Sequence, residues 1–169
     1  MRVFGIVGRQ NSGKTHLIEH LVQHCNALGL RVSTVKHTHH HAPELEPPHK
    51  DSARHRAAGA QEVLLAWEQG WLLSRAGHGA TPPLPDLLGQ LAPCDLVLVE
   101  GYKQVAGLPR LEVYRGGEPP LALQDPTLLG VACPVTQALP GLRVPRLDLA
   151  DTAGIAAVVL AAAVPPDRT

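Results

Sequence analysis

A glycine-rich segment near the start of the chain, GRQNSGKT at residues 8–15, matches the pattern G-x-x-x-x-G-K-[ST] at every defined position. This pattern is typical of a loop whose backbone N–H groups turn inward around a chain of phosphates. Glycine at both ends permits backbone angles and a close approach that a side chain would block. The segment predicts a nucleotide-binding site. Its phosphate-binding residues are Gly8, Arg9, Gln10, Asn11, Ser12, Gly13, Lys14 and Thr15.

The last two residues of this segment carry specific chemistry. Lys14 opens a predicted helix, where its ammonium group can reach the outer phosphates beside the positive end of the helix dipole. Thr15 offers a hydroxyl to a magnesium ion that bridges phosphate oxygens. The apolar run at 3–7 predicts a buried strand before the loop, and apolar residues at helical spacing predict a helix after it, ended by Gly29. Strand, loop and helix in this order are the context that a phosphate loop requires.

A carboxylate follows a second apolar run. Residues Leu96 to Val99 predict a buried strand that ends in Glu100 and is followed at once by Gly101. Ligands of open α/β sheets bind at the carboxyl ends of the strands, so Glu100 is expected near the phosphate loop. A carboxylate there can hold magnesium directly or through water. We predict that Thr15 and Glu100 together organise Mg²⁺, and that Glu100 takes part in catalysis.

Basic residues cluster where a loop enters a short predicted helix. Arg54, His55 and Arg56 follow Lys50-Asp51, and the two arginines are candidates to bind a phosphate, including a pterin phosphate. Simple solvation of this helix face is the alternative interpretation. Arginines that clamp a transferred phosphoryl group would also suit a small-molecule kinase. No other segment suggests the acceptor site and base that a kinase needs.

A histidine cluster, His37 with residues 39–41, suggests transition-metal binding, because neutral imidazole is a common zinc, nickel or copper ligand. A P-loop joined to a histidine-rich segment would suit a nickel-insertion GTPase, and this metallochaperone is a second alternative function. Such proteins carry an N/T-K-x-D base-recognition element, which this chain lacks. A solvated loop without bound metal is the simpler account of the cluster.

Composition argues against nucleic-acid-binding, secreted and membrane-spanning classes of protein. The 169 residues carry 15 basic and 15 acidic side chains, so we expect no general attraction to nucleic acid. The three cysteines form no C-x-x-C pair, which favours a reducing, cytoplasmic compartment. Met1-Arg2 leads directly into the first strand, so no signal peptide is expected. The apolar stretch at 153–164 is too short to span a bilayer. We predict one domain, 1–169, with a disordered tail at 165–169.

Strand and helix signals alternate along the chain, which predicts a parallel α/β sheet. The expected strands lie at 31–36, 62–75 (two paired strands around Gln69-Gly70), 94–101, 109–115 (half-exposed) and 127–133, and the expected helices at 51–60, at 84–91 and after an Asp151 cap. The predicted fold is a P-loop NTPase-like three-layer α/β sandwich, with a mostly parallel sheet and an antiparallel strand extension.

Five segments, GRQNSGKT, VSTVKHTHH, KDSARHRAAGA, DLVLVEGYK and PRLEVYR, occur in the order expected of the MobB family of GTP-binding proteins. The chain resembles this family over essentially its whole length. The resemblance implies a homodimeric P-loop protein of molybdenum cofactor biosynthesis that binds GTP with Mg²⁺ and hydrolyses it weakly. It implies a MobA-type guanylyltransferase as partner, which attaches GMP to the molybdopterin cofactor. It also places Asp51 near the nucleotide, as a second catalytic candidate for positioning metal or water.

The chain departs from the family pattern in several places; Tyr102 after VEG and PRLE at 109–112 are mild changes, and two others are larger. Pro48-His49-Lys50 replaces the usual turn before KDS, and the segment ACPVT at 132–136 stands where the family tends to have a polar run ending in Asp. With no N-K-x-D element, guanine preference depends on the resemblance alone. The predicted function is a GTP-binding accessory protein. The predicted homodimer uses the β surface at 62–75 and 109–115, because unprotected strand edges are normally paired or covered.

Overall fold

The structure is a computed structural model that describes residues 1–38, 47–77 and 81–169. The chain divides into two compact units. The first contains Met1–Thr38 and Pro83–Thr169, and the second spans His39–Pro82. Among the described residues, no helix has the length and apolarity needed to cross a bilayer.

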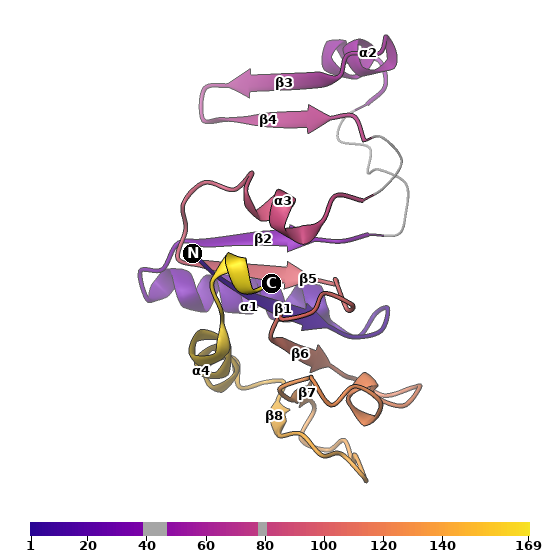
Figure 1. Ribbon diagram of the computed structural model, residues 1–169, viewed down its shortest axis with the longest axis vertical. Helices are drawn as coiled ribbons and strands as arrows, with labels where there is room; N and C mark the ends of the chain where they lie inside the picture. Colours follow the sequence, from indigo (N-terminus) through magenta and orange to yellow (C-terminus); the bar gives the residue numbers. More distant parts are fainter. Residues whose placement is uncertain (39–46, 78–80) are drawn as a thin grey trace. The chain divides into compact units, whose positions relative to one another are not determined.

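The first unit is built on a six-stranded sheet in the order β2-β5-β1-β6-β7-β8, in which every neighbouring pair is parallel (Figure 1). Strands β1 and β5 are interior strands, and their apolar runs are covered on both faces of the sheet. The strands are β1 (Arg2–Val7), β2 (Val32–Lys36), β5 (Leu96–Glu100), β6 (Arg110–Val113), β7 (Val131–Cys133) and β8 (Arg146–Asp148). The helices are α1 (Lys14–Ala27), α3 (Leu84–Leu88) and α4 (Thr152–Ala162), with 3₁₀ turns η1 (Leu121–Leu123) and η2 (Pro166–Arg168).

Alternating side chains of the central strands build a core on each face of the sheet. In β5, Leu96 and Leu98 pack in one cluster with α1 and α4, whereas Val97 and Val99 pack in the other with α3. Successive side chains of a strand point to opposite faces, so one apolar run supplies both cores. Helix, sheet and helix therefore form three layers, and the predicted α/β P-loop NTPase-like fold is confirmed.

The ends of the two long helices follow their sequence signals. Helix α1 begins directly after Gly13, as predicted, and ends before Gly29, whose φ of 79° is in the left-handed region. Helix α4 is capped by Asp151, whose Oδ1 accepts a 2.9 Å hydrogen bond from the Gly154 amide. The start of α1 at Lys14 leaves residues 8–13 as the loop that joins β1 to α1.

The second unit consists of α2 (Asp51–Ala57) and a hairpin of β3 (Glu62–Trp67) and β4 (Gly70–Arg75). The two strands are antiparallel, with Trp67 opposite Gly70, which confirms the predicted strand pair. The connecting residues are Glu68 and Gln69, one position earlier than the predicted turn. The hairpin exposes large apolar side chains, with exposed fractions of 41 to 64%: Leu64, Leu65, Trp67 and Trp71.

Two strands of the sheet differ from what the sequence predicted. The strand at 109–115 was expected to be half-exposed, but all four residues of β6 are buried. Leu111 and Val113 pack in the core, and Arg110 and Glu112 bind the chain that follows β6. Strand β6 also lies between β1 and β7, so both of its edges are paired. The edges of β6 are therefore not available for dimer formation. Strand β8 was not predicted, because its three residues are too few to show an alternating pattern. The single domain with a disordered tail stays a prediction, although residues 166–168 form a 3₁₀ turn.

Candidate functional site

The glycine-rich loop joins β1 to α1 with the backbone angles that its sequence requires. Gly8, Asn11 and Gly13 have φ values of 150°, 59° and 93°. A Cβ added to Gly8 would lie 2.5 Å from the carbonyl oxygen of Val113 and 2.7 Å from the hydroxyl of Ser12. Positive φ is costly for most side chains but accessible to glycine and tolerated by asparagine. The residue types of the loop are therefore explained by its shape.

Two polar side chains of the loop, Ser12 and Lys14, have no anionic hydrogen-bond acceptor among the described residues. The Ser12 hydroxyl is buried and has no hydrogen-bond partner among the described residues. Lys14 folds back on the loop and donates a 2.6 Å hydrogen bond from Nζ to the carbonyl oxygen of Arg9. Burial lowers the pKa of Lys14, an effect that the negative charge of Glu100 partly opposes. A phosphate chain would give both groups the anionic acceptors they lack.

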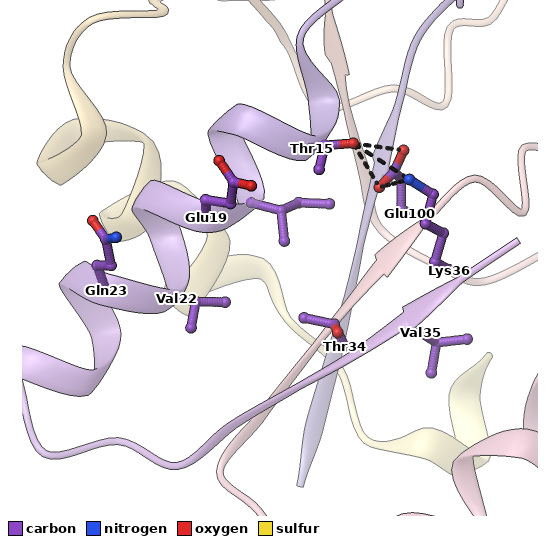
Figure 2. Close-up of a pocket in the computed structure, with 9 residues that line it drawn as sticks. Thr15, Glu19, Val22, Gln23, Thr34, Val35, Lys36 and Glu100 are labelled. Carbon is purple, nitrogen blue, oxygen red and sulfur yellow. Dashed lines mark hydrogen bonds and ion pairs between the residues drawn. The ribbon is translucent and has the colours of Figure 1, made fainter. Parts of the chain in front are cut away.

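The carboxyl end of β5 meets the start of α1, as predicted (Figure 2). The Thr15 hydroxyl lies 3.2 Å from Oε2 of Glu100, to which it donates a hydrogen bond. Lys36 Nζ lies 3.4 Å from the same oxygen, and the Glu100 side chain is only 13% exposed. These groups line one end of a 390 Å³ pocket between α1 and β2. Hydroxyl and carboxylate oxygens are the ligand types that Mg²⁺ prefers, so these residues suit that ion.

The ion pair with Lys36 was missed by sequence reasoning. Lys36 is the last residue of β2, and the register places it directly opposite Glu100. Its only sequence signal is its position at the end of an apolar strand. The order of the strands was needed to know that β2 and β5 are neighbours.

A second missed residue lies on the other side of the loop. Arg115 comes two residues after the end of β6, and a Cβ added to Gly13 would lie 2.9 Å from its Nε. The loop is also held from this side, because Arg9 forms a 2.5 Å ion pair with Glu118 and donates a 3.2 Å hydrogen bond to the carbonyl oxygen of Pro119. The segment after β6 therefore contacts the phosphate loop directly.

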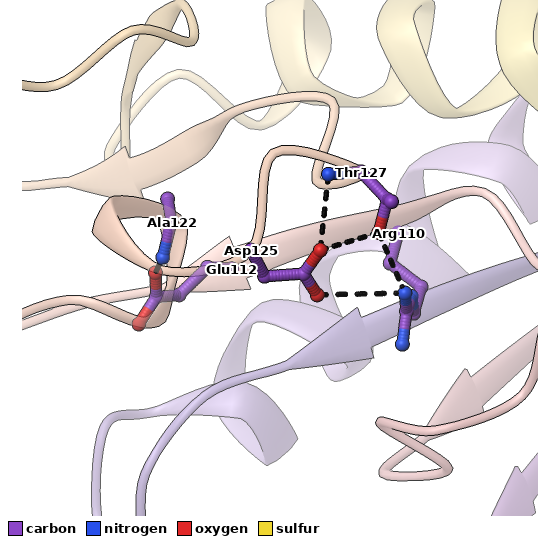
Figure 3. A network of polar contacts seen from close by, with 5 residues as sticks. All are labelled: Arg110, Glu112, Ala122, Asp125 and Thr127. Carbon is purple, nitrogen blue, oxygen red and sulfur yellow. Dashed lines mark hydrogen bonds and ion pairs between the residues drawn. The ribbon is translucent and has the colours of Figure 1, made fainter.

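A buried carboxylate anchors that segment (Figure 3). Glu112 of β6 is fully buried, and its two oxygens accept hydrogen bonds of 2.8 and 2.9 Å from the amides of Leu121 and Ala122. Two residues away, Arg110 donates a 2.8 Å hydrogen bond to the Thr127 hydroxyl. Each bond ties β6 to the chain that follows it. The segment 114–123 provides the contacts with the loop. It leaves β6 at one end and is bonded back to Glu112 of β6 at the other.

A neighbouring carboxylate belongs to the same network. Asp125 Oδ2 lies 3.5 Å from Arg110 Nη2. A hydrogen bond from the Thr127 hydroxyl, supported by its backbone amide and the charge of Arg110, lowers the pKa of Asp125. The ionised carboxylate therefore stabilises the turn that precedes β7.

The histidine cluster is described only in part. His37 follows β2, and its ring centroid lies 5.0 Å from that of Tyr102. The remaining histidines of the cluster, at 39–41, lie outside the described residues. Within the described part of the chain, no group of three or more His, Cys, Asp or Glu side chains is arranged to hold a metal ion.

The other predicted site residues belong to the second unit. Asp51 and Arg54 lie on α2, where Arg54 Nη1 is 3.6 Å from Asp51 Oδ1 and both side chains are largely exposed. Arg56 lies on the same helix. The roles of these three residues at the nucleotide stay predictions.

The parallel sheet, the glycine-rich loop before α1 and the Thr15–Glu100 pair define the class of the protein, a P-loop NTPase-like α/β protein. Residues 3–134 match the family model MobB, described as molybdopterin guanine dinucleotide synthesis protein B. The chain belongs to the MobB family.

Individual relatives agree with this family assignment. A molybdopterin-guanine dinucleotide biosynthesis adapter protein of Haemophilus influenzae is 37% identical over 119 residues, 67% of this chain and 63% of that protein. The chain thus spans less than two thirds of this relative. The Escherichia coli protein of the same name is 32% identical over 154 residues, 88% of this chain and 86% of that one. The crystal structure of a MobB homologue from Bacillus stearothermophilus superposes with a TM-score of 0.68 at 27% identity, covering 95% and 97% of the two chains.

Proposed function

We propose that this protein binds GTP with Mg²⁺ at the loop 8–15 and acts as an accessory factor in the formation of molybdopterin guanine dinucleotide. The observation that carries the proposal is the loop itself. Its left-handed residues, and a Ser12 hydroxyl with no hydrogen-bond partner among the described residues, suit a phosphate chain beside the Thr15–Glu100 pair. The named relatives are adapter proteins of this pathway, and they support the biological assignment.

Each residue has a defined task in this proposal. Backbone amides of the loop and the N-terminus of α1 hold the phosphates. Lys14 leaves the Arg9 carbonyl, to which it now donates, and pairs with the outer phosphates. Thr15 and Glu100 supply oxygen ligands, while Lys36 balances the charge of Glu100 before the ion binds. Bound Mg²⁺ would neutralise phosphate charge during hydrolysis.

Hydrolysis is expected to be slow. A fast nucleoside triphosphatase needs a group that orients water and a cation that offsets charge on the transferred phosphoryl. Arg9 is held by Glu118 and Pro119, so its guanidinium is already engaged. Arg54 and Asp51 are paired with each other on α2. The protein would therefore act mainly by binding, with any acceleration supplied by a partner such as a MobA-type guanylyltransferase carrying molybdopterin.

The proposal is tested by isothermal titration calorimetry of GTP and ATP, with Mg²⁺ or with EDTA, on the wild type and on Lys14→Ala. We expect magnesium-dependent GTP binding that is lost in Lys14→Ala, because Lys14 is the loop cation placed to reach the outer phosphates, whereas Arg9 is paired with Glu118. The variant should keep its fold and unfold close to the wild-type temperature in circular dichroism, because the Lys14 side chain belongs to no core cluster and the change removes a single hydrogen bond. GTP binding of equal affinity in both proteins would refute the assignment of the loop.

The partner is tested by adding a MobA-type transferase loaded with molybdopterin. We expect the transferase to bind the GTP-loaded protein and to form more guanine dinucleotide in its presence. Lys14→Ala, which should not bind GTP, serves as the control. Equal stimulation by the wild type and the variant would contradict a nucleotide-dependent accessory role.

A homodimer is also part of the proposal, formed through the second unit. A lone two-stranded hairpin is marginally stable, and this one exposes apolar side chains on both of its faces, including Leu64 and Trp71 on one and Leu65 and Trp67 on the other. A second copy of the hairpin would cover them and pair a free strand edge. Light scattering at micromolar concentration should give a dimer, and Trp71→Glu should give a monomer. A monomeric wild type would contradict this part.

All three cysteines are free and buried. Free thiols are typical of reducing compartments, so the proposal places the protein in the cytoplasm.

A further inference from the structure

A second cavity begins at the phosphate loop and opens away from the Thr15–Glu100 pair. It has a volume of 660 Å³, within the range of small-molecule sites. Its walls come from the first turns of α1, from the segments after β6 and β7, and from the end of β8. The lining residues used below are Gly13, Leu17, Arg115, Val135, Asp148 and Leu149.

The position of this cavity suits the nucleoside part of the proposed ligand. Thr15 and Glu100 mark the end of the phosphate chain that would carry the metal ion, and they line the other pocket. The nucleoside is attached at the opposite end of that chain, so it must leave the loop on another side. The cavity starts at Gly13, on the loop, and lies at the carboxyl ends of parallel strands, where ligands of such sheets bind.

The walls of the cavity suit a flat aromatic ring. Leu17 and Leu149 supply apolar surface, and Val135 is 68% exposed at the cavity although it is apolar. Arg115 lies beside Gly13 and can pack its planar guanidinium on a ring face. A nucleotide base in this position would cover Val135, and the hydrogen-bonding edge of the base would face β8.

The edge of that base would meet a single carboxylate. Among the described residues that line the cavity, Asp148 is the one acidic residue. Its Oδ1 accepts a 3.0 Å hydrogen bond from the Ala150 amide, which fixes the carboxylate, and its Oδ2 has no hydrogen-bond partner among the described residues. The backbone amide of Leu149 donates to the carbonyl oxygen of Cys133, which ties this turn to the end of β7. The hydrogen bond from Ala150 therefore orients the carboxylate and leaves its second oxygen as an acceptor at the cavity.

We propose that Asp148 is the residue that selects guanine, by accepting hydrogen bonds from the N1–H and the 2-amino group of the base. A carboxylate only accepts hydrogen bonds, and it pairs with two adjacent N–H donors in parallel. Adenine offers an acceptor at N1 and no 2-amino group, so it would be repelled at the same place. The chain has no N-K-x-D element, and residues 134–136 at the end of β7 contain no carboxylate. The neighbouring strand β8 provides one instead. The inference rests on the proposed nucleotide binding.

The test compares GTP, ATP and xanthosine triphosphate in calorimetric titrations of the wild type, Asp148→Asn and Asp167→Asn with Mg²⁺. Asparagine retains the oxygen that accepts from Ala150, so the turn is preserved, but it replaces the second acceptor with a donor. Xanthine carries a carbonyl oxygen where guanine carries the 2-amino group, and that oxygen suits the new donor. Asp167 is exposed and is not among the residues that line the cavity, so its variant is the matched control.

We expect Asp148→Asn to lose about 10- to 100-fold in GTP affinity, as for a charge-assisted pair, and to gain affinity for xanthosine triphosphate. ATP binding should stay weak throughout, and Asp167→Asn should match the wild type. A wild type that binds ATP as tightly as GTP, or an Asp148→Asn variant with unchanged GTP affinity, would overturn the role of Asp148 while leaving nucleotide binding intact. A wild type that binds none of the three would refute the proposed nucleotide binding, and the inference with it.

Discussion

Replacing Glu112 with glutamine removes one oxygen from the buried carboxylate that holds the segment after β6. Each Glu112 oxygen accepts one backbone hydrogen bond, from Leu121 at 2.8 Å and from Ala122 at 2.9 Å. Glutamine retains one acceptor and turns its NH₂ group toward the other amide. One hydrogen bond is lost and two donors face each other inside the protein, where neither can reach water.

The magnitude follows from this count. A hydrogen bond to a charged group contributes about 1.5–3 kcal/mol, and a buried unpaired donor costs about 1–3 kcal/mol. Since a carboxylate is also costly to bury, the two effects do not add fully, and we expect the free energy of unfolding to fall by about 2–4 kcal/mol. For a chain of this size, that corresponds to a decrease in Tm of roughly 5–15 °C.

The assay is urea and thermal unfolding followed by circular dichroism, with Glu68→Gln as the matched control. Glu68 is exposed in the hairpin loop, so the same substitution there should change stability by no more than about 0.5 kcal/mol. If Glu112→Gln unfolded at the same urea concentration and temperature as Glu68→Gln, the carboxylate would not be anchoring the segment. A dehydrated, well-paired Glu112 could not give that result.

Three further predictions concern other parts of the first unit. Glu100→Ala should reduce magnesium-dependent GTP hydrolysis more than GTP affinity, because the loop backbone still holds the phosphates; wild-type turnover of the variant in a phosphate-release assay would refute the role of Glu100. Asp151→Ala should lower the free energy of unfolding by about 1 kcal/mol, the usual effect of removing an N-cap, and an unchanged urea midpoint would contradict the cap at Gly154. Hydrogen bonds from Arg31 lower the pKa of Asp95 to about 2, so this stabilisation is present above pH 4 and is lost as the pH falls toward 2. Thermal unfolding between pH 4 and pH 2 should therefore be less pH-dependent in Asp95→Asn than in the wild type, and identical slopes would show that the pair contributes nothing.

The shape of the glycine-rich loop could be predicted from sequence because its geometry is local. The spacing of Gly8 and Gly13 reports backbone angles that a few adjacent residues determine. The meeting of Thr15 and Glu100 was also predictable, because ligand-binding residues gather at the carboxyl edge of a parallel sheet. To predict both features, it was enough to know which segments are strands and helices. The order of the strands in the sheet was not required.

The features that were missed depend on which strands are neighbours. Lys36 is an ordinary strand-end lysine until β2 is placed beside β5. Strand β6 has an alternating sequence that is typical of a half-exposed strand, but Glu112 and Arg110 are buried because they bind the chain that follows. Asp148 could not be assigned, because β8 is three residues long and its cavity is formed by segments far apart in the sequence. The Lys36 ion pair, the burial of β6 and the position of Asp148 all depend on contacts between segments that are distant in sequence. Local sequence carries little information about such contacts.

The strand order also governs how the chain acquires its structure during synthesis. Val3 of β1 pairs with Val97 of β5 and forms a separate bridge with Val164, so the first strand made has no partner until β5 is complete. The hairpin at 62–75 needs only local contacts and can close within microseconds, whereas the parallel pairs must close long loops and form slowly. The apolar strand β1 therefore remains without its β5 partner while residues 8–95 are translated. Substitutions that slow the pairing of β1 with β5 should reduce the yield of folded protein in cells more than they reduce its stability once folded.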